Sequence, residues 1–154
     1  VIRAYTALKE KRNLLNLYTL LFTMPGIPCV YYGSEFGAEG DKSDLDYKLR
    51  PFIGDIDKTK HPELVEHIKK LAAIRRSSRA LSYGTYQKAT IMNRNFSFIR
   101  ECDGERVIVA INIEDHDCTI RVEEAEGTDL LTGQVRNLND IYLPPFTASI
   151  YRRN

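Results

Sequence analysis

The sequence predicts an α+β fold, in which two helices and one isolated strand precede an antiparallel β-sandwich. Three observations support this class. Apolar residues recur at helical spacing over residues 4–22, and an apolar run fills residues 27–32 between turn residues. Short strand patterns then follow one another from residue 86 to residue 152.

The first predicted helix spans residues 4–22 and has a broad apolar face. Near-helical spacing relates Tyr5, Leu8, Leu15, Tyr18 and Phe22. So much apolar surface implies that the helix is buried against a large neighbour. Pro25 and Gly26 are expected to stop it.

Residues 27–32 lie between Pro25-Gly26 and Gly33 and are apolar throughout. A run of this kind is typical of a strand that is buried on both faces of a parallel sheet. The polar residues Ser34 and Glu35 follow at once. A carboxylate just beyond such a strand occupies the position where α/β barrels place their working groups.

Residues 37–60 are rich in Gly, Asp and Lys and show no periodicity. They predict a loop of about 20 residues, and loops of that length are usually functional or disordered. A second helix is expected over residues 62–77. Pro62 occupies its first turn, and Glu63 and Glu66 lie near the positive end of its dipole.

The second half of the chain carries strand signals separated by turn residues such as Asp103-Gly104. The predicted strands are 86–92, 96–101, 106–113, 118–122, 129–131, 139–143 and 148–152. Short strands at this spacing indicate an antiparallel sandwich. With a boundary near residues 79–83, we expect two domains, 1–79 and 80–154.

Composition excludes several classes of partner. The 22 basic and 21 acidic residues give a net charge of +1, so no attraction to nucleic acid or to an anionic membrane is expected. No apolar stretch approaches membrane-spanning length, and no signal peptide is visible. The three histidines lack metal-ligand spacing, and no cofactor motif is present, so we expect no metal and no cofactor.

The three cysteines, Cys29, Cys102 and Cys118, are an odd number at no metal-like spacing. We expect them to be small buried apolar residues of a reduced compartment, which favours a cytoplasmic location. The chain starts at Val1 and enters a helical pattern almost directly. We therefore expect it to be a fragment of a longer protein.

The motif MPGIPCVYYGSEFG at residues 24–37, with helices on both sides and strands beyond, resembles the C-terminal part of the α-amylase family of glycoside hydrolases. In that family a (β/α)₈ barrel is followed by an all-β domain C. The resemblance covers essentially the whole chain. It implies that residues 4–24 form the seventh barrel helix, 27–32 the eighth strand and 62–77 the eighth helix. The segments DLLTG at 129–133 and LPPF at 143–146 resemble the usual close of domain C.

The same resemblance implies that the catalytic carboxylates lie outside this chain. Family members carry an Asn-His-Asp element that is often followed three residues later by an arginine, and Arg3 fits that arginine. The nucleophile and the acid/base would precede this element. Family members retain anomeric configuration, which requires two carboxyl groups about 5 Å apart. We therefore assign no catalytic residue and expect the chain alone to be inactive.

The resemblance implies a partial substrate site at Asp46 and Arg50, which match a family loop pattern that binds a sugar on the non-reducing side of the cleavage point. A carboxylate accepts hydrogen bonds from sugar hydroxyls, and a guanidinium donates to them. The alternative is a surface ion pair, which is worth little.

Four other side chains in or near this loop carry separate expectations. Glu35 either faces the substrate cleft or, as we favour, holds neighbouring loops through hydrogen bonds. Tyr47 is a candidate to stack on a sugar because the loop should expose it. We expect Tyr31 and Tyr32 to pack in the core.

Several alternatives remain open. The expected substrate class is α-glucans, such as starch, maltodextrins or cyclodextrins. A non-catalytic carbohydrate-binding module is a second function, although the strand-rich half has no Trp and only scattered Tyr; a structural module is the third.

An unpaired strand at 27–32 would be costly. Either it pairs with a second copy in a homo-oligomer, or the helices pack on the sandwich and the segment is not a strand.

Overall fold

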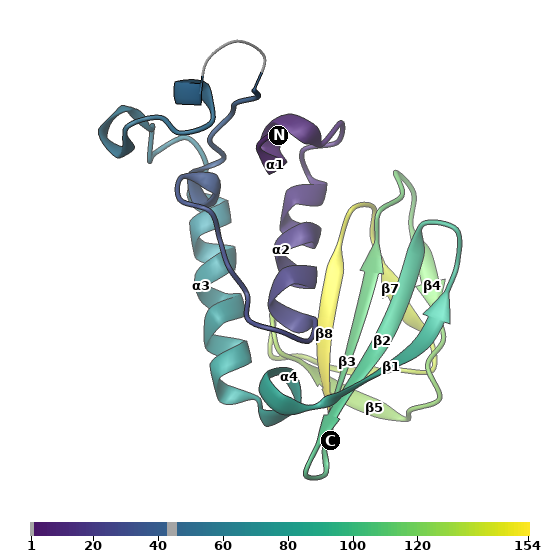
Figure 1. Cartoon of the computed structure of the whole chain (residues 1–154). Helices are drawn as coiled ribbons and strands as arrows, with labels where there is room; N and C mark the ends of the chain where they lie inside the picture. Colours follow the sequence, from purple (N-terminus) through teal and green to yellow (C-terminus); the bar gives the residue numbers. More distant parts are fainter. Residues whose placement is uncertain (1, 43–45) are drawn as a thin grey trace.

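The computed structural model describes residues 2–42 and 46–154, so residues 43–45 of the predicted loop lie outside the described residues. Two long helices stand beside a twisted antiparallel sheet, with α2 between α3 and the sheet (Figure 1). A second, small sheet covers the other face. The α+β class predicted from the sequence is confirmed.

The helices of the described residues are two long and two short ones, with bounds α1 Ala4–Ala7, α2 Asn13–Thr23, α3 Pro62–Ser77 and α4 Arg79–Tyr83. The prediction for 62–77 is confirmed. None of these helices is long and apolar enough to cross a membrane.

The predicted helix over 4–22 is wrong in its first half, because the chain leaves the helix after Ala7 and resumes it at Asn13. The Glu10 carboxylate accepts hydrogen bonds from the backbone N–H and the guanidinium of Arg12, at 3.0 and 2.9 Å. The Lys11 ammonium donates to the carbonyl of Leu8 at 2.8 Å. Such local side-chain bonds compete with helical ones and break the helix here.

The strand predicted at residues 27–32 is absent from the described structure. Ile27 is 94% exposed, and Arg75 donates to the carbonyls of Met24 and Gly26 at 3.0 and 2.5 Å. A strand exists only where a neighbour pairs with it, and no strand of the described residues lies beside this segment. Within the single chain the helices pack on the sheet and residues 27–32 do not form a strand.

The loop region is irregular but held together by three short 3₁₀ helices, η1 Ser34–Phe36, η2 Asp46–Lys48 and η3 Ile53–Asp55. Within this loop the backbone at Gly40 passes close to the backbone at Lys48. Gly40 has a φ of +155°, and a Cβ there would lie 2.0 Å from the backbone oxygen of Lys48. Only glycine therefore allows this crossing.

The described residues form eight strands in two sheets. Their bounds are β1 Thr85–Ile91, β2 Asn95–Cys102, β3 Glu105–Asn112, β4 Cys118–Ile120, β5 Glu126–Asp129, β6 Val135–Asn137, β7 Ile141–Leu143 and β8 Ala148–Arg153. The larger sheet has the order β1-β2-β3-β8-β5-β6, and β4 pairs with β7. All neighbours are antiparallel.

This arrangement confirms the sandwich but corrects its strand list. The sequence predicts seven strands and misses β6, whose three residues are all exposed and show no apolar alternation. It also places β5 too late, at 129–131, because Glu126 and Gly127 are poor strand formers.

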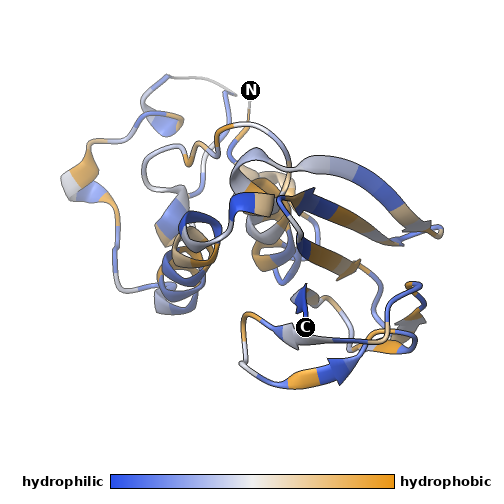
Figure 2. Cartoon of the chain, turned by 90° about the horizontal axis from the view of Figure 1, so that it is seen from below, coloured by the Kyte–Doolittle hydropathy of each residue, from blue (hydrophilic) through white to orange (hydrophobic). Residues whose placement is uncertain are grey.

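The larger sheet buries apolar residues on both faces, which gives two cores. The first joins the helices to the sheet and contains Leu14, Tyr18, Phe22, Leu64, Leu71, Ala80, Leu81, Phe98, Val107, Val109, Ile111 and Ile150. The second lies between the sheets and contains Ile99, Ile108, Ala110, Ile120, Val122, Leu138, Ile141, Leu143 and Tyr151. Figure 2 shows hydrophobic residues on the strands and helices that meet in these cores.

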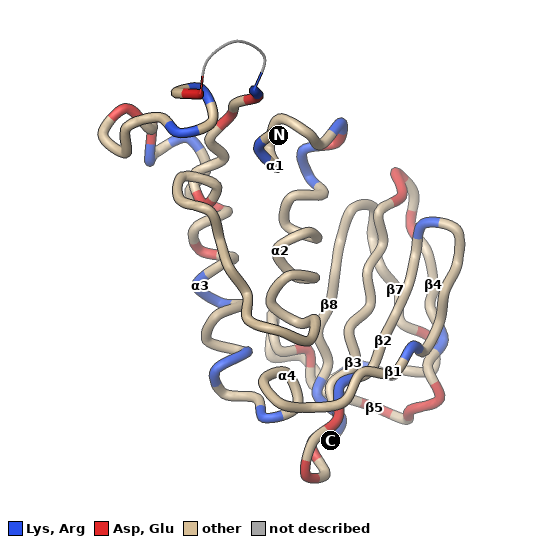
Figure 3. Tube along the Cα trace, in the orientation of Figure 1, with Lys and Arg blue, Asp and Glu red and all other residues tan. Residues whose placement is uncertain are grey.

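Apart from the buried Arg75 and Arg100, charged residues are rare at these contacts. The helix α2 carries none, and Figure 3 shows Lys, Arg, Asp and Glu mainly on loops, on α3 and at the ends of strands. The cysteines differ from expectation: all three are free, but Cys29 is exposed and the other two are half-buried. Cys29 is exposed because the segment around it does not enter a sheet.

Candidate functional site

A cavity of about 580 Å³ lies beside α2 and brings together three segments that are distant in sequence. Leu17, Tyr18 and Leu21 of α2 supply an apolar wall. The remainder is lined by residues 2–4, by residues 29–31 with Ser34, and by Lys42, Asp46, Leu49 and Arg50. We call it the barrel-side cavity, because the resemblance places residues 27–32 in a barrel.

Arg3 holds the polar end of the barrel-side cavity together. It is only 4% exposed, and its Nε and Nη2 donate to the carbonyl of Leu49 at 3.1 and 2.8 Å. Its Nη1 donates to the carbonyl of Tyr32 at 3.0 Å. The rings of Tyr31 and Tyr32 lie 5.0 and 5.4 Å from the guanidinium carbon, within cation–π range. One buried cation thus links the chain start to both loop segments.

Asp46 and Arg50 line the barrel-side cavity and form an ion pair, with 3.4 Å between Asp46 Oδ2 and Arg50 Nη1. Their side chains are 59% and 69% exposed. The short helix η2 sets this geometry, since the backbone N–H of Arg50 donates to the carbonyl of Asp46 at 3.1 Å. An exposed pair of this kind adds about 0–1 kcal/mol to stability. Both groups stay accessible to a ligand.

Glu35 lies in η1 next to the cavity but does not line it. Its Oε2 is buried and has no hydrogen-bond partner among the described residues. The hydroxyl of Tyr18 is likewise without a partner in that part of the chain. Burial, and then the charge of Glu35, raise the pKa of Tyr18 to about 12. Glu35 is therefore near enough to act electrostatically on the hydroxyl of Tyr18, a residue that lines the cavity.

The tyrosines are placed differently from one another. Tyr47 is 63% exposed but lies outside the cavity, in a shallow depression of about 590 Å³ near Thr6 and Pro51. Tyr31 and Tyr32 are 49% and 36% exposed, so the expectation that they pack in the core is wrong. They turn toward Arg3 instead, and Tyr31 lines the cavity.

Sequence reasoning missed Tyr18 as a cavity residue. Its position on the apolar face of a helix identified it only as core. The available signal is chemical: a buried tyrosine hydroxyl usually has a hydrogen-bond partner, so a tyrosine within an apolar stripe points to a polar feature nearby.

One group of metal-ligating residue types occurs in the described residues. Glu114, Asp115 and His116 place their ligand atoms within 4.8 Å of one another in an exposed turn. His116 Nδ1 lies 3.0 Å from Asp115 Oδ1, and this hydrogen bond raises the pKa of His116. The group is a local ion pair on the surface.

The chain is similar in sequence to known glycoside hydrolases. It is 36% identical over 134 residues to a cyclomaltodextrinase of Thermoanaerobacter pseudethanolicus, covering 85% of this chain and 23% of that protein. A cyclomaltodextrinase of Geobacillus thermopakistaniensis is 33% identical over 152 residues, covering 92% of this chain and 25% of that protein. No protein-family model matches the chain.

Solved structures show the same likeness. The maltogenic amylase from S. marinus superposes with a TM-score of 0.79 at 29% identity, covering 99% of this chain and 21% of that one. An α-amylase from Anoxybacillus gives 0.72 at 29% identity, covering 91% of this chain and 31% of that one.

These similarities extend over both the helical and the strand-rich parts of the chain. The chain therefore belongs to the α-amylase family of glycoside hydrolases, which confirms the resemblance drawn from the sequence. It spans about a quarter of the length of the curated relatives that it matches.

Proposed function

We propose that this chain is the C-terminal part of a retaining glycosidase that acts on α-glucans such as starch, maltodextrins and cyclodextrins. Residues 1–79 would complete its barrel, and residues 80–154 would form its domain C. The observation that carries the proposal is the match to a cyclomaltodextrinase across 85% of the chain.

The barrel-side cavity supplies one wall of the substrate site in this proposal. Asp46 accepts hydrogen bonds from two adjacent sugar hydroxyls, and Arg50 donates to the same sugar. Their exposure and their position on the cavity support this role. Tyr47 stacks on a neighbouring sugar.

The chain alone is expected to be inactive, because a retaining mechanism needs two carboxyl groups that the family places upstream. Release of reducing sugar from β-cyclodextrin, maltoheptaose and starch tests this expectation. The chain by itself should give no release above buffer. The same chain fused behind the preceding region of a cyclomaltodextrinase should give turnover; a fusion that folds but turns over none of the three substrates would overturn the α-glucan assignment.

The same fusion tests the site residues. Asp46→Asn and Arg50→Met should each lower kcat/KM by about 10- to 100-fold, the cost of one or two charged hydrogen bonds. Arg79→Met, a change to another exposed ion-paired arginine that lies outside both sites, is the matched control. Unchanged kcat/KM in both site variants would remove these residues from the substrate site.

Two finer proposals concern partners and location. Exposed Ile27 and the apolar wall of α2 support self-association of the isolated chain through the barrel-side cavity. Light scattering after size-exclusion chromatography should then show a dimer that Ile27→Asp abolishes. The three free cysteines support a reducing, cytoplasmic location, which cell fractionation would test.

A further inference from the structure

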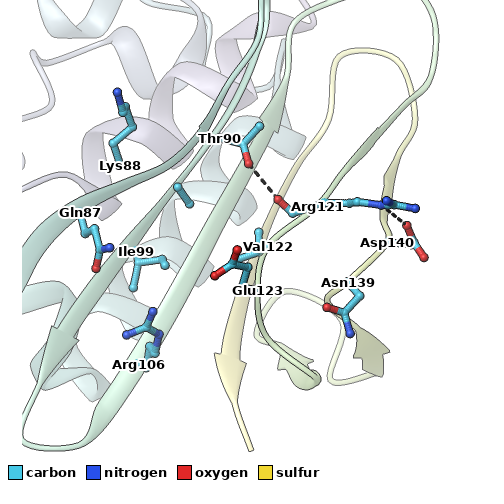
Figure 4. Close-up of a pocket in the computed structure, with 11 residues that line it drawn as sticks. Gln87, Lys88, Thr90, Ile99, Arg106, Arg121, Val122, Glu123, Asn139 and Asp140 are labelled. Atoms are coloured by element: carbon cyan, nitrogen blue, oxygen red, sulfur yellow. Dashed lines mark hydrogen bonds and ion pairs between the residues drawn. The ribbon is translucent and has the colours of Figure 1, made fainter.

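We propose that a groove at the open edge of the β-sandwich is a second α-glucan-binding site. We call it the edge groove; it lies between residues 87–90 of β1 on one side and residues 121–123 and 139–140 on the other (Figure 4). Its volume of about 650 Å³ is within the range of small-ligand sites. The choice of an α-glucan as the ligand rests on the function proposed above.

The two walls of the edge groove are fixed at both ends. At one end the Thr90 hydroxyl donates to the carbonyl of Arg121 at 2.8 Å. At the other end Arg106, on the larger sheet, lies 2.5 Å from a carboxylate oxygen of Glu124. Figure 4 shows Thr90 and Arg106 at opposite ends of the groove. Because the walls are already held apart, a ligand would not have to open them.

The floor of the edge groove is apolar and rigid. Ile99 and Val122 are 5% and 6% exposed, and both belong to the core between the two sheets. Ala89 packs against the same core. A strip of methyl groups at the base of a polar groove suits the C–H face of a sugar ring, which is also apolar.

The rims carry unused amide groups. Gln87 on β1 and Asn139 on the opposite wall are exposed, and their side-chain amides make no hydrogen bond within the described residues. Each amide has two donors and one acceptor oxygen, so it can bind a hydroxyl in either direction. Amides on opposite walls of a groove therefore match a ligand with hydroxyls on both edges.

The charges around the edge groove favour a neutral ligand. Arg121 pairs with Asp140 at 3.1 Å, and Arg106 pairs with both Glu101 and Glu124 at 2.5 Å. These two arginines are neutralised locally, and the other charged lining residues, Lys88 and Glu123, carry opposite charges, so the groove has little net charge to attract an ion of either sign. Arginine–carboxylate pairs still present donors and acceptors to hydroxyls. No aromatic ring lines the groove, so we expect weak binding, with a Kd on the order of 1 mM.

A titration of this chain with maltoheptaose, followed by amide chemical shifts in nuclear magnetic resonance, tests the inference. Shifts should change at residues 87–90, 121–123 and 139–140. The double change Gln87→Ala with Asn139→Ala should weaken binding there by about tenfold. Asn93→Ala, which removes an exposed amide outside the groove, should leave it unchanged.

Three outcomes would overturn the proposal: no shift changes at the groove, the same changes with cellohexaose, or binding there that survives the double substitution. The double change involves exposed side chains, and an unaltered spectrum elsewhere shows that the fold is kept. A parallel titration of Asp46→Asn separates this site from the barrel-side cavity, since groove shifts should persist in it. Turnover by the fusion described above tests the proposed function independently of these shifts.

Discussion

The two halves of this chain provide hydrogen-bond partners for their backbone carbonyls in different ways. In the strand-rich half, carbonyls accept from the N–H groups of neighbouring strands along regular ladders. Around residues 22–50, buried arginines take over this task. Arg75 donates to the carbonyl of Phe22 at 2.7 Å, and Arg100 donates to that of Thr23 at 2.5 Å.

This difference matters for how robust each half is. A ladder divides its hydrogen bonds among many residues, whereas Arg75 and Arg100 concentrate them at the C-terminus of α2, where the helix dipole favours a cation. Neither arginine has a carboxylate partner in the described part of the chain. Burial lowers the pKa of both guanidinium groups, yet they remain charged because carbonyl oxygens surround them. Substitution of either arginine should therefore do more damage than a single substitution within the ladders.

The largest expected effect comes from separating the halves. Removing residues 1–78 would expose Phe98, Val107, Val109, Ile111 and Ile150, which are at most 1% exposed in the intact chain. Their burial is worth about 8–15 kcal/mol as an upper bound, comparable with the whole stability of a domain. Residues 79–154 alone should bind a hydrophobic dye and melt without cooperativity by circular dichroism. A sharp transition at the Tm of the intact chain would show that the strands need no helices.

Arg100→Met should have the next largest effect, a loss of about 3 kcal/mol in the free energy of unfolding. It removes the donor from the buried carbonyl of Thr23 and from the part-buried carbonyls of Gly84 and Thr85. Urea unfolding would measure the change. Arg121→Met is the matched control and should cost less than about 1 kcal/mol, because its pair is exposed. Equal losses in the two variants would contradict the central role of the carbonyl contacts.

A smaller effect should appear with pH, through His67 between α2 and α3. Its Nε2 lies 2.9 Å from Thr19 Oγ1, and burial lowers its pKa below the usual 6.5. The folded protein then binds fewer protons than the unfolded chain below about pH 6.5. Its stability should be full above this pH and should fall as the pH drops through it.

Thermal melts between pH 7.5 and pH 5 would measure this dependence. His67→Gln should remove this fall in stability at acid pH. His116→Gln, at an exposed histidine whose pKa is instead raised, is the control and should leave the fall in place. A profile that His67→Gln leaves unchanged would assign the titration to another group.

The smallest expected effect is that of Asp46→Asn on stability, below about 1 kcal/mol, because its ion pair with Arg50 is exposed. This result would sharpen the comparison, since it separates a residue kept for binding from residues kept for folding. Urea unfolding of the variant beside the parent chain measures it. A loss as large as that of Arg100→Met would mean that Asp46 is structural.

The features predicted well from the sequence are those fixed by local patterns. The helix Pro62–Ser77 has an N-terminal proline and a regular apolar stripe, and the buried strand β3 is nearly continuous in Val and Ile. The errors occur where distant partners decide. The segment 27–32 would form a strand only if another strand paired with it. The break before Asn13 depends on how the side chains of Glu10 and Lys11 compete for the backbone.

The same division applies to the candidate site. Asp46 and Arg50 are four residues apart, so their proximity in a helical turn is visible in the sequence. The contacts of Arg3 with Leu49 and Tyr32 join residues 46 and 29 positions apart, which no local pattern encodes. Tyr18 joins the cavity for the same reason, through the packing of α2.

The exposure of Cys29 makes the segment around it open to chemical labelling. Its thiol lies on the surface and lines the barrel-side cavity, whereas Cys118 is half-buried with a raised pKa and so carries less of the reactive thiolate. A thiol-reactive fluorophore should therefore attach to Cys29 first. A fluorophore attached at Cys29 would therefore report, through a change in its emission, when another polypeptide covers residues 27–32.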